Sequence, residues 1–179
     1  EVTGSGVVVK DVRIDFTYST ALLINKTTSK PRPANVLIEG VHISRGSVGY
    51  YATVDAEVWD ALPYDIICAT KYSDGTIFRD CIVRHSYAEG IVAGKGANGT
   101  LIERCVSYNN HHMGIYINNA KNTTVRYCVS WSTAHPETIR SNFGSEAFVH
   151  AQEERGANDV GYDFSSGHKV YCNIFVGGK

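Results

Sequence analysis

Three cysteines recur at the same point of a repeating phrase, and this repeat restricts the chain to a small set of folds. Cys81, Cys105 and Cys128 lie 24 and then 23 residues apart. Each follows an alternating apolar segment and precedes a polar corner and a second short apolar segment. A unit of this length cannot bury its own apolar face. A fixed period in the range of about 20 to 50 residues therefore predicts stacked coils that share one continuous core.

The residues within each unit predict strands rather than helices. The units contain short runs rich in Val, Ile, Tyr and Thr, separated by Gly and Asn-Asn corners, and these residue types favour strands and turns. Leucine-rich, ankyrin and tetratricopeptide repeats need a leucine lattice or amphipathic helices, which the units lack. The sequence therefore predicts an all-β solenoid.

One segment carries a resemblance to a known family. Residues 105–117, CVSYNNHHMGIYI, resemble the repeat of the right-handed parallel β-helix proteins of the pectate-lyase-like superfamily, which has a strand, an Asn-rich turn and a Gly-Ile strand. The resemblance implies a right-handed parallel β-helix of about six to seven coils, each of roughly 22 to 24 residues.

Weaker copies of the phrase extend it over nearly the whole chain, which predicts a single β-helix domain over 1–179. They place Asp11 and Gly40 near the cysteine position, and Cys172 restores the cysteine. The interval from Gly40 to Cys81 is longer than the repeat, which predicts an insertion at about 47–65. The 44 residues from Cys128 to Cys172 fit either two coils of about 22 residues or one coil with an excursion at about 153–168.

Stacking should place the three repeated cysteine side chains about 4.8 Å apart along the solenoid. We expect a ladder of small, buried, unoxidised cysteines, because free cysteine is among the most buried residue types. The alternative is a zinc or disulfide site. The chain has no CxxC pair and an odd count of five cysteines, which favours the buried ladder.

Composition excludes some classes of function. The chain has 179 residues, 43% of them hydrophobic, with a net charge of −1 and a pI near 6.7. This charge argues against a nucleic-acid surface, and no apolar run is long enough for membrane insertion. Glycosylation sequons begin at Asn25, Asn98 and Asn122. Together with the resemblance, whose members are mostly secreted, they predict an extracellular or cell-surface location.

The ends of the sequence show no amphipathic helix that would cap a solenoid. An open terminal coil exposes apolar residues and unpaired backbone groups. We therefore expect either that the chain is part of a longer protein or that it self-associates end to end through these ends.

The corner before each Gly-Ile strand holds most of the candidate catalytic residues. If the third unit lacks one residue, Tyr87, His111 and His135 form one column across the coils. If the deletion falls later, His112 and His135 stack instead. The same alignment gives two further columns, Glu89 with Met113 and Glu137, and Val92 with Tyr116 and Arg140.

These residue types suit chemistry on uronate-containing polysaccharides. A lyase or C5-epimerase must neutralise a carboxylate and remove the C5 proton. Arg140 could neutralise, with His111, His135 or Tyr116 as base or acid. A hydrolase would instead use two carboxylates, Glu89 and Glu137, about 9.6 Å apart at the backbone, a separation that fits inversion.

Structural roles compete with these catalytic ones. Asn109 and Asn110 are expected to form the turn itself, and the corner histidines could be solvated turn residues. The arginine and aspartate signatures of pectate lyases, polygalacturonases and mannuronan epimerases do not occur in the sequence.

The insertion at 47–65 combines aromatic and acidic residues. Tyr51, Trp59 and Tyr64, together with Tyr87 of the corner, are candidates for stacking on sugar rings. The clustered acids suggest calcium as a cofactor, although their spacing matches no calcium loop; no other cofactor or metal is indicated. The alternative is that these rings pack over the coil wall and the acids stay solvated.

Three classes of function follow. The first is a secreted polysaccharide-associated protein with lyase or C5-epimerase activity. The second is a structural, self-assembling surface protein, and the third is a non-catalytic glycan-binding module or adhesin.

Overall fold

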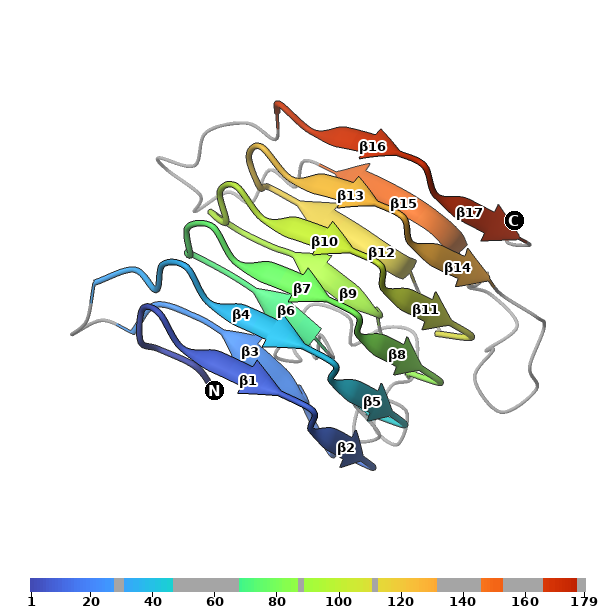
Figure 1. Cartoon of the computed structure of the whole chain (residues 1–179), viewed down its shortest axis with the longest axis horizontal. Helices are drawn as coiled ribbons and strands as arrows, with labels where there is room; N and C mark the ends of the chain where they lie inside the picture. Colours follow the sequence, from blue (N-terminus) through green and yellow to red (C-terminus); the bar gives the residue numbers. More distant parts are fainter. Residues whose placement is uncertain are drawn as a thin grey trace, which may run out of the picture.

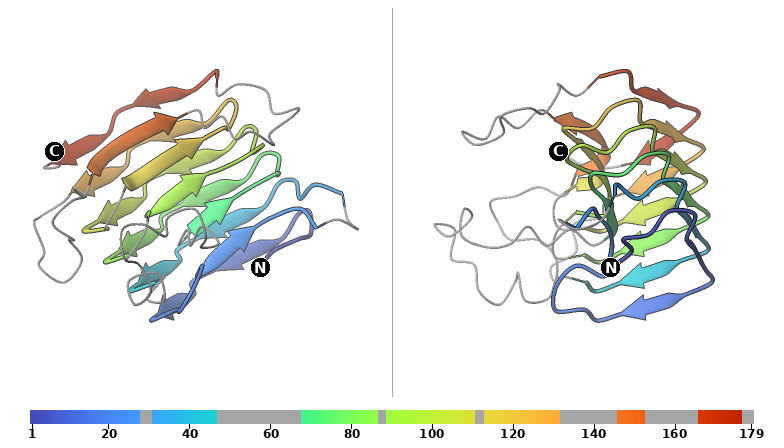
Figure 2. Two further views of the ribbon diagram at one scale, coloured as in Figure 1. Left: turned by 180° about the vertical axis from the view of Figure 1, so that it is seen from behind. Right: turned by 90° about the vertical axis from the view of Figure 1, so that its left-hand side faces the viewer.

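The chain forms a stack of coils in a computed structural model, which describes residues 1–27, 31–46, 68–86, 89–110, 113–131, 146–152 and 166–176, with only the backbone for 146–152. Each of the first five coils contributes a strand to each of three sheets, the last described coil contributes strands to two of them, and every strand pairing is parallel (Figure 1). Figure 2 shows the same stack from behind and from the side. The described residues therefore form a parallel β-helix.

The three sheets are numbered here by their first strand. Sheet 1 contains β1 (Val8–Lys10), β4 (Leu37–Glu39), β7 (Ile77–Arg79), β10 (Leu101–Glu103), β13 (Thr124–Arg126) and β16 (Lys169–Tyr171). Sheet 2 contains β2 (Arg13–Asp15), β5 (His42–Ser44), β8 (Ile82–Arg84), β11 (Val106–Tyr108), β14 (Val129–Trp131) and β17 (Ile174–Val176). Sheet 3 contains β3 (Leu22–Ile24), β6 (Cys68–Thr70), β9 (Ile91–Ala93), β12 (Met113–Asn118) and β15 (Glu146–Gln152).

The register of sheet 1 settles how many coils the last interval contains. Successive partners are 29, 40, 24, 23 and 45 residues apart, at Val8, Leu37, Ile77, Leu101, Thr124 and Lys169. β13 pairs directly with β16, so the interval from Cys128 to Cys172 is one coil with a long excursion. Of the two alternatives that the spacing allows, two coils of equal length is therefore wrong.

Two residues join each sheet 1 strand to the following sheet 2 strand, and the first of them forms the corner. The corner residue has a positive φ in every described coil, at Asp11, Gly40, Asp80, Arg104, Tyr127 and Cys172. Cys172 is therefore in register with Tyr127 and is exposed. Its assignment to the cysteine column is wrong by one residue, because sequence spacing alone does not distinguish the corner from the buried position that follows it.

The interior position after the corner holds the cysteine ladder. Cys81, Cys105 and Cys128 are buried and free, which confirms the predicted ladder of unoxidised thiols. In the last coil Asn173 occupies this position, and its side-chain oxygen accepts a hydrogen bond from the backbone N–H of Cys128 at 2.8 Å. The remaining core consists of stacked Ile, Val and Phe side chains that are fully buried, such as Ile38, Phe78 and Ile102.

The outer face of sheet 1 carries a ladder of alternating charges. Lys10, Glu39, Arg79, Glu103 and Arg126 occupy one outward column across five coils. The nitrogen–oxygen distances between successive members are 2.9, 3.6, 2.7 and 2.6 Å. Glu103 lies between two arginines and is only 3% exposed. Each charge of this ladder therefore has a neighbour of opposite sign.

Candidate anion-binding site

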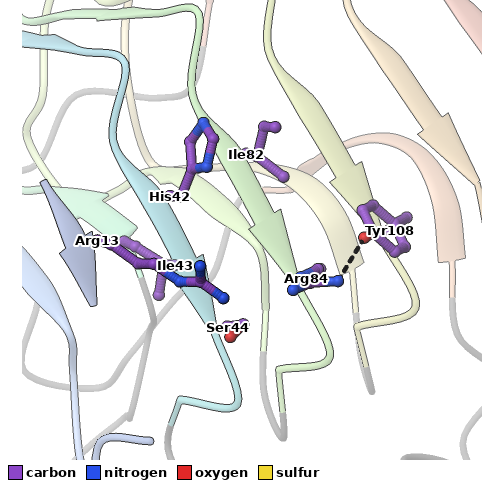
Figure 3. A pocket seen from close by; sticks show the side chains of 7 residues that line it. All are labelled: Arg13, His42, Ile43, Ser44, Ile82, Arg84 and Tyr108. Atoms are coloured by element: carbon purple, nitrogen blue, oxygen red, sulfur yellow. Dashed lines mark hydrogen bonds between the residues drawn. The ribbon is translucent and has the colours of Figure 1, made fainter. Parts of the chain in front are cut away.

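The outer face of sheet 2 contains a depression of about 230 Å³. Residues from four successive strands line it (Figure 3): Arg13, His42, Ile43, Ser44, Ile82, Arg84 and Tyr108. Arg13 reaches from β2 across β5 toward Arg84 on β8. The first and third residues of these strands face outward because side chains alternate along a strand, and the second residue, such as Ile43 or Val83, is buried in the core.

Among the described residues, two arginines at this depression have no carboxylate partner. Seven arginines are described, and five of them, Arg32, Arg45, Arg79, Arg104 and Arg126, each form an ion pair with Asp or Glu. Within the described part of the chain, no ion pair involves Arg13 or Arg84, and both line the depression. The pocket therefore concentrates positive charge in a protein whose net charge is −1.

An aromatic pair holds Arg84 in place. Its Nη1 donates a hydrogen bond to the Tyr108 hydroxyl at 3.1 Å. The Tyr108 ring stacks on Trp131 of the next coil, with centroids 4.2 Å apart and planes inclined by 9°. His85 contacts the same tyrosine ring edge-on at 5.5 Å. Trp131 covers one face of the Tyr108 ring, so that face is not available to stack on a ligand. The aromatic pair instead restrains the guanidinium of Arg84.

An acidic residue near the pocket, Asp15, already forms an ion pair. Asp15 accepts a hydrogen bond from Ser44 Oγ at 2.6 Å and forms an ion pair with Arg45 at 2.5 Å. Hydrogen bonds from Arg45 and then Ser44 hold the pKa of Asp15 well below its ordinary value. His42 is exposed and lines the same depression.

This arrangement can bind oxyanions. A guanidinium presents a planar fork of donors that matches carboxylate, sulfate and phosphate groups, and such charge-assisted hydrogen bonds are stronger than neutral ones. Arg13 and Arg84 lie two coils apart along the solenoid and line the same depression. The site therefore suits an extended ligand with several acidic groups.

A comparison with protein families identifies the fold. The family described as right handed beta helix region matches residues 1–143, which is most of the chain. The protein belongs to the right-handed β-helix family. This membership, with the three parallel sheets, confirms the predicted fold class. No curated protein matches the chain.

The sheet 3 register of this β-helix corrects two predicted columns. Tyr116 pairs with Val92 as predicted, but its partner in the following coil is His150 rather than Arg140. Met113 pairs with Glu146 rather than Glu137. The reason is that β15 begins at Glu146. The segment between β14 and β15 is therefore several residues longer than the repeat predicts, whereas the alignment assumed a one-residue deletion.

The structure describes two of the predicted catalytic residues, Glu89 and Tyr116. Glu89 is partly buried, and its role as a hydrolase carboxylate stays a prediction. Tyr116 is 4% exposed and packs on the outer side of sheet 3 with Ala69, Val92 and Met113. Its role as acid or base stays a prediction.

The other predicted site residues of the β-helix lie outside the described residues. They are the catalytic candidates His111, His135, Glu137 and Arg140, and the substrate-binding candidates Tyr51, Trp59, Tyr64 and Tyr87. The insertion at 47–65 and most of the excursion at 153–168 lie there too. Their proposed roles, and end-to-end association of the solenoid, stay predictions.

The predicted structural role of the corner asparagines is confirmed. Asn109 has a φ of 51°. The Asn110 side chain accepts a hydrogen bond from the Ser86 backbone and donates one to Ser107 Oγ. These contacts join neighbouring coils at the corner between sheets 2 and 3.

The sequons differ in exposure. Asn98 and Asn122 are exposed at the corner between sheets 3 and 1, and Nδ2 of Asn122 donates a hydrogen bond to Oδ1 of Asn98 at 2.9 Å. Asn25 is partly buried. Glycosylation at any of the three stays a prediction.

The described residues include no group of three or more His, Cys, Asp or Glu side chains arranged to hold a metal ion. Calcium binding therefore stays a prediction. The same part of the chain has no helix long and apolar enough to cross a bilayer.

Sequence reasoning missed the sheet 2 pocket because it searched the corners. The pocket residues come from Arg13-Ile-Asp, His42-Ile-Ser, Ile82-Val-Arg and Val106-Ser-Tyr, each directly after the sheet 1 corner and its interior residue. Once the repeats are aligned, the third residue of these triplets forms the column Asp15, Ser44, Arg84 and Tyr108. This alignment was the available signal.

Proposed function

We propose that this β-helix protein binds acidic polysaccharides on the outer face of sheet 2. The observation that carries the proposal is that the only two described arginines without an ion-pair partner, Arg13 and Arg84, line the same depression. An unpaired surface cation gains most from a ligand that supplies the missing anion.

A polysaccharide fits this surface better than a nucleic acid does. The two described arginines without an ion pair lie at one depression, whereas nucleic-acid surfaces usually carry a basic patch or stripe within a basic domain, and this chain has a pI near 6.7. The cations are spread over successive strands, whose spacing is about 4.8 Å. An extended chain of uronate units, lying along the solenoid, would present carboxylates to both arginines. With such a ligand, an extracellular or cell-surface location is proposed.

Lyase or C5-epimerase chemistry is a finer proposal at the same site. Arg13 or Arg84 would neutralise the uronate carboxylate, and His42 or Tyr108 would remove the C5 proton. In a lyase the C5–H electron pair forms the C4–C5 double bond while the C4–O bond breaks, and the leaving oxygen takes up a proton. In an epimerase a proton returns to C5 from the opposite face. His111 and His135 of the corner remain candidates for these acid and base roles.

Binding is tested by titrating the protein with oligogalacturonate, alginate fragments and heparin, with dextran as a neutral control. We expect saturable binding of at least one acidic glycan, weakened by salt and by Arg84→Ala, with no binding of dextran. Arg79→Ala is the matched control, because Arg79 belongs to the paired ladder on sheet 1. Equal affinity in wild type and Arg84→Ala would refute the proposed site.

Turnover is tested separately with the glycans that bind. Absorbance of the unsaturated product reports lyase activity, and NMR of the C5 configuration reports epimerisation, each with and without calcium. Product that disappears in His42→Ala or Tyr108→Phe would support catalysis in the pocket. Binding without product would leave a glycan-binding module.

A further inference from the structure

The acidic residue nearest to the pocket arginines in register is Asp15. It stands two residues after Arg13 on the same outward face of β2, and side chains in this relation lie about 7 Å apart. It also shares a column with Arg84, with Ser44 between them. Left to itself, this carboxylate would attract the cations that a bound polysaccharide needs.

Arg45 keeps the Asp15 carboxylate engaged elsewhere. Its Nε and Nη2 contact the two carboxylate oxygens at 3.1 and 2.5 Å, a bidentate arrangement. Ser44 Oγ also donates a hydrogen bond to Oδ1 of Asp15. The guanidinium of Arg45 also lies 5.5 Å from the centre of the Phe16 ring, which fixes its position from a second side.

The backbone explains how Arg45 reaches Asp15. Arg45 follows β5 at a corner with a φ of 51°, in the same column as Phe16, His85 and Asn109. Its backbone N–H bonds to the carbonyl of Arg84 in the following coil. This left-handed corner turns the chain out of the strand direction, and Arg45 pairs with the preceding coil.

We infer that Arg45 sets the affinity of the pocket for acidic polysaccharide by holding Asp15 in an ion pair, so that Arg13 and Arg84 stay available to the ligand. This inference rests on the proposed function. Arg45 is a positioning residue in this scheme, because it acts through Asp15 rather than by touching the ligand.

Removing Arg45 should expose the ligand to an uncompensated carboxylate. For unit charges about 7 Å apart at a protein surface, the repulsion corresponds to a loss of affinity of about threefold to tenfold at low salt. Asp15→Asn should change affinity less than twofold in the presence of Arg45, since the charge that it removes is already paired.

The test is a double-mutant cycle with oligogalacturonate, or another acidic glycan that the wild type binds, at pH 7 and low salt. We expect Arg45→Ala to weaken binding, and the double variant Asp15→Asn with Arg45→Ala to recover the affinity of Asp15→Asn. Arg45→Lys, which keeps the charge, should recover part of the loss. The melting temperature of each variant separates an affinity effect from a loss of fold.

Two outcomes would overturn the inference. If the double variant binds as weakly as Arg45→Ala, Arg45 contacts the ligand directly. If Arg45→Ala binds as wild type does, Asp15 has no influence on the pocket. Both differ from failure of the proposed function, in which the wild type binds no acidic glycan or Arg84→Ala binds as tightly as the wild type.

Discussion

The outer faces of sheets 1 and 2 use the same backbone spacing for opposite purposes. On sheet 1, Glu103 lies between Arg79 and Arg126, and every cation of the ladder touches a carboxylate. On sheet 2, the one described carboxylate on the outward face, Asp15, is paired with Arg45. Among the described residues, no ion pair involves Arg13 or Arg84, which line the depression.

The difference separates stability from binding. Charges that are satisfied within the solenoid hold neighbouring coils together, and they have little left to offer a ligand. Charges that remain unpaired contribute little to the fold and create a local positive potential. The outer face of sheet 1 is therefore expected to govern the stability of the fold, and the outer face of sheet 2 to govern affinity for the ligand.

The largest effect is expected from removing both unpaired cations. Arg13→Ala combined with Arg84→Ala should lower affinity for acidic glycan by about 100-fold or more, since a hydrogen bond to a charged group contributes about 1.5 to 3 kcal/mol. Isothermal titration calorimetry measures the loss. The melting temperature should stay near the wild-type value, and a large fall in it would break the proposed separation.

Glu103→Gln should produce the converse result. The substitution leaves Arg79 and Arg126 without their shared carboxylate at a position that is 3% exposed. We expect the free energy of unfolding to fall by about 1 to 3 kcal/mol, measured by urea denaturation. Glycan affinity should not change; a parallel loss of affinity would show that the two faces are coupled.

The pH dependence of stability should also come from sheet 1. Burial alone would raise the pKa of Glu103, but hydrogen bonds from Arg126 and Arg79 bring it below the ordinary value. A group with a lowered folded-state pKa stabilises the protein above its unfolded pKa, about 4.3 for glutamate, and loses this contribution as the pH falls through the folded pKa. Urea denaturation from pH 7 to pH 3 should show this decline, and Glu103→Gln should make it shallower.

The smallest effect is expected at Trp131. Trp131→Ala removes the ring that stacks on Tyr108, whose hydroxyl accepts the hydrogen bond from Arg84. Affinity for acidic glycan should fall a few-fold, because an aromatic pair contributes about 0.5 to 1.5 kcal/mol. Trp131→Phe is the control and should keep most of the affinity. An unchanged affinity in Trp131→Ala would mean that Tyr108 holds Arg84 without help.

The local repeat was sufficient to predict the fold and part of its interior. The cysteine period, the alternation of apolar residues and the Asn-Asn corner are properties of short segments, and the strands, the buried Cys105 and the left-handed Asn109 follow from them. The repeat also aligned Val92 with Tyr116 correctly. Where the chain departs from the period, after β14, the same reasoning placed Glu137 and Arg140 beside strands that pair instead with Glu146 and His150.

The sequence by itself determined the β-helix, its cysteine ladder and its asparagine corners, because each depends on residues within one coil. Only the tertiary structure decided which coil lies against which and where charges meet. Arg13 and Arg84 are 71 residues apart in the sequence and share one depression, while the ion pairs that distinguish the two faces join residues 23 to 40 positions apart. Variable coil length sets these contacts, and local patterns carry no record of it.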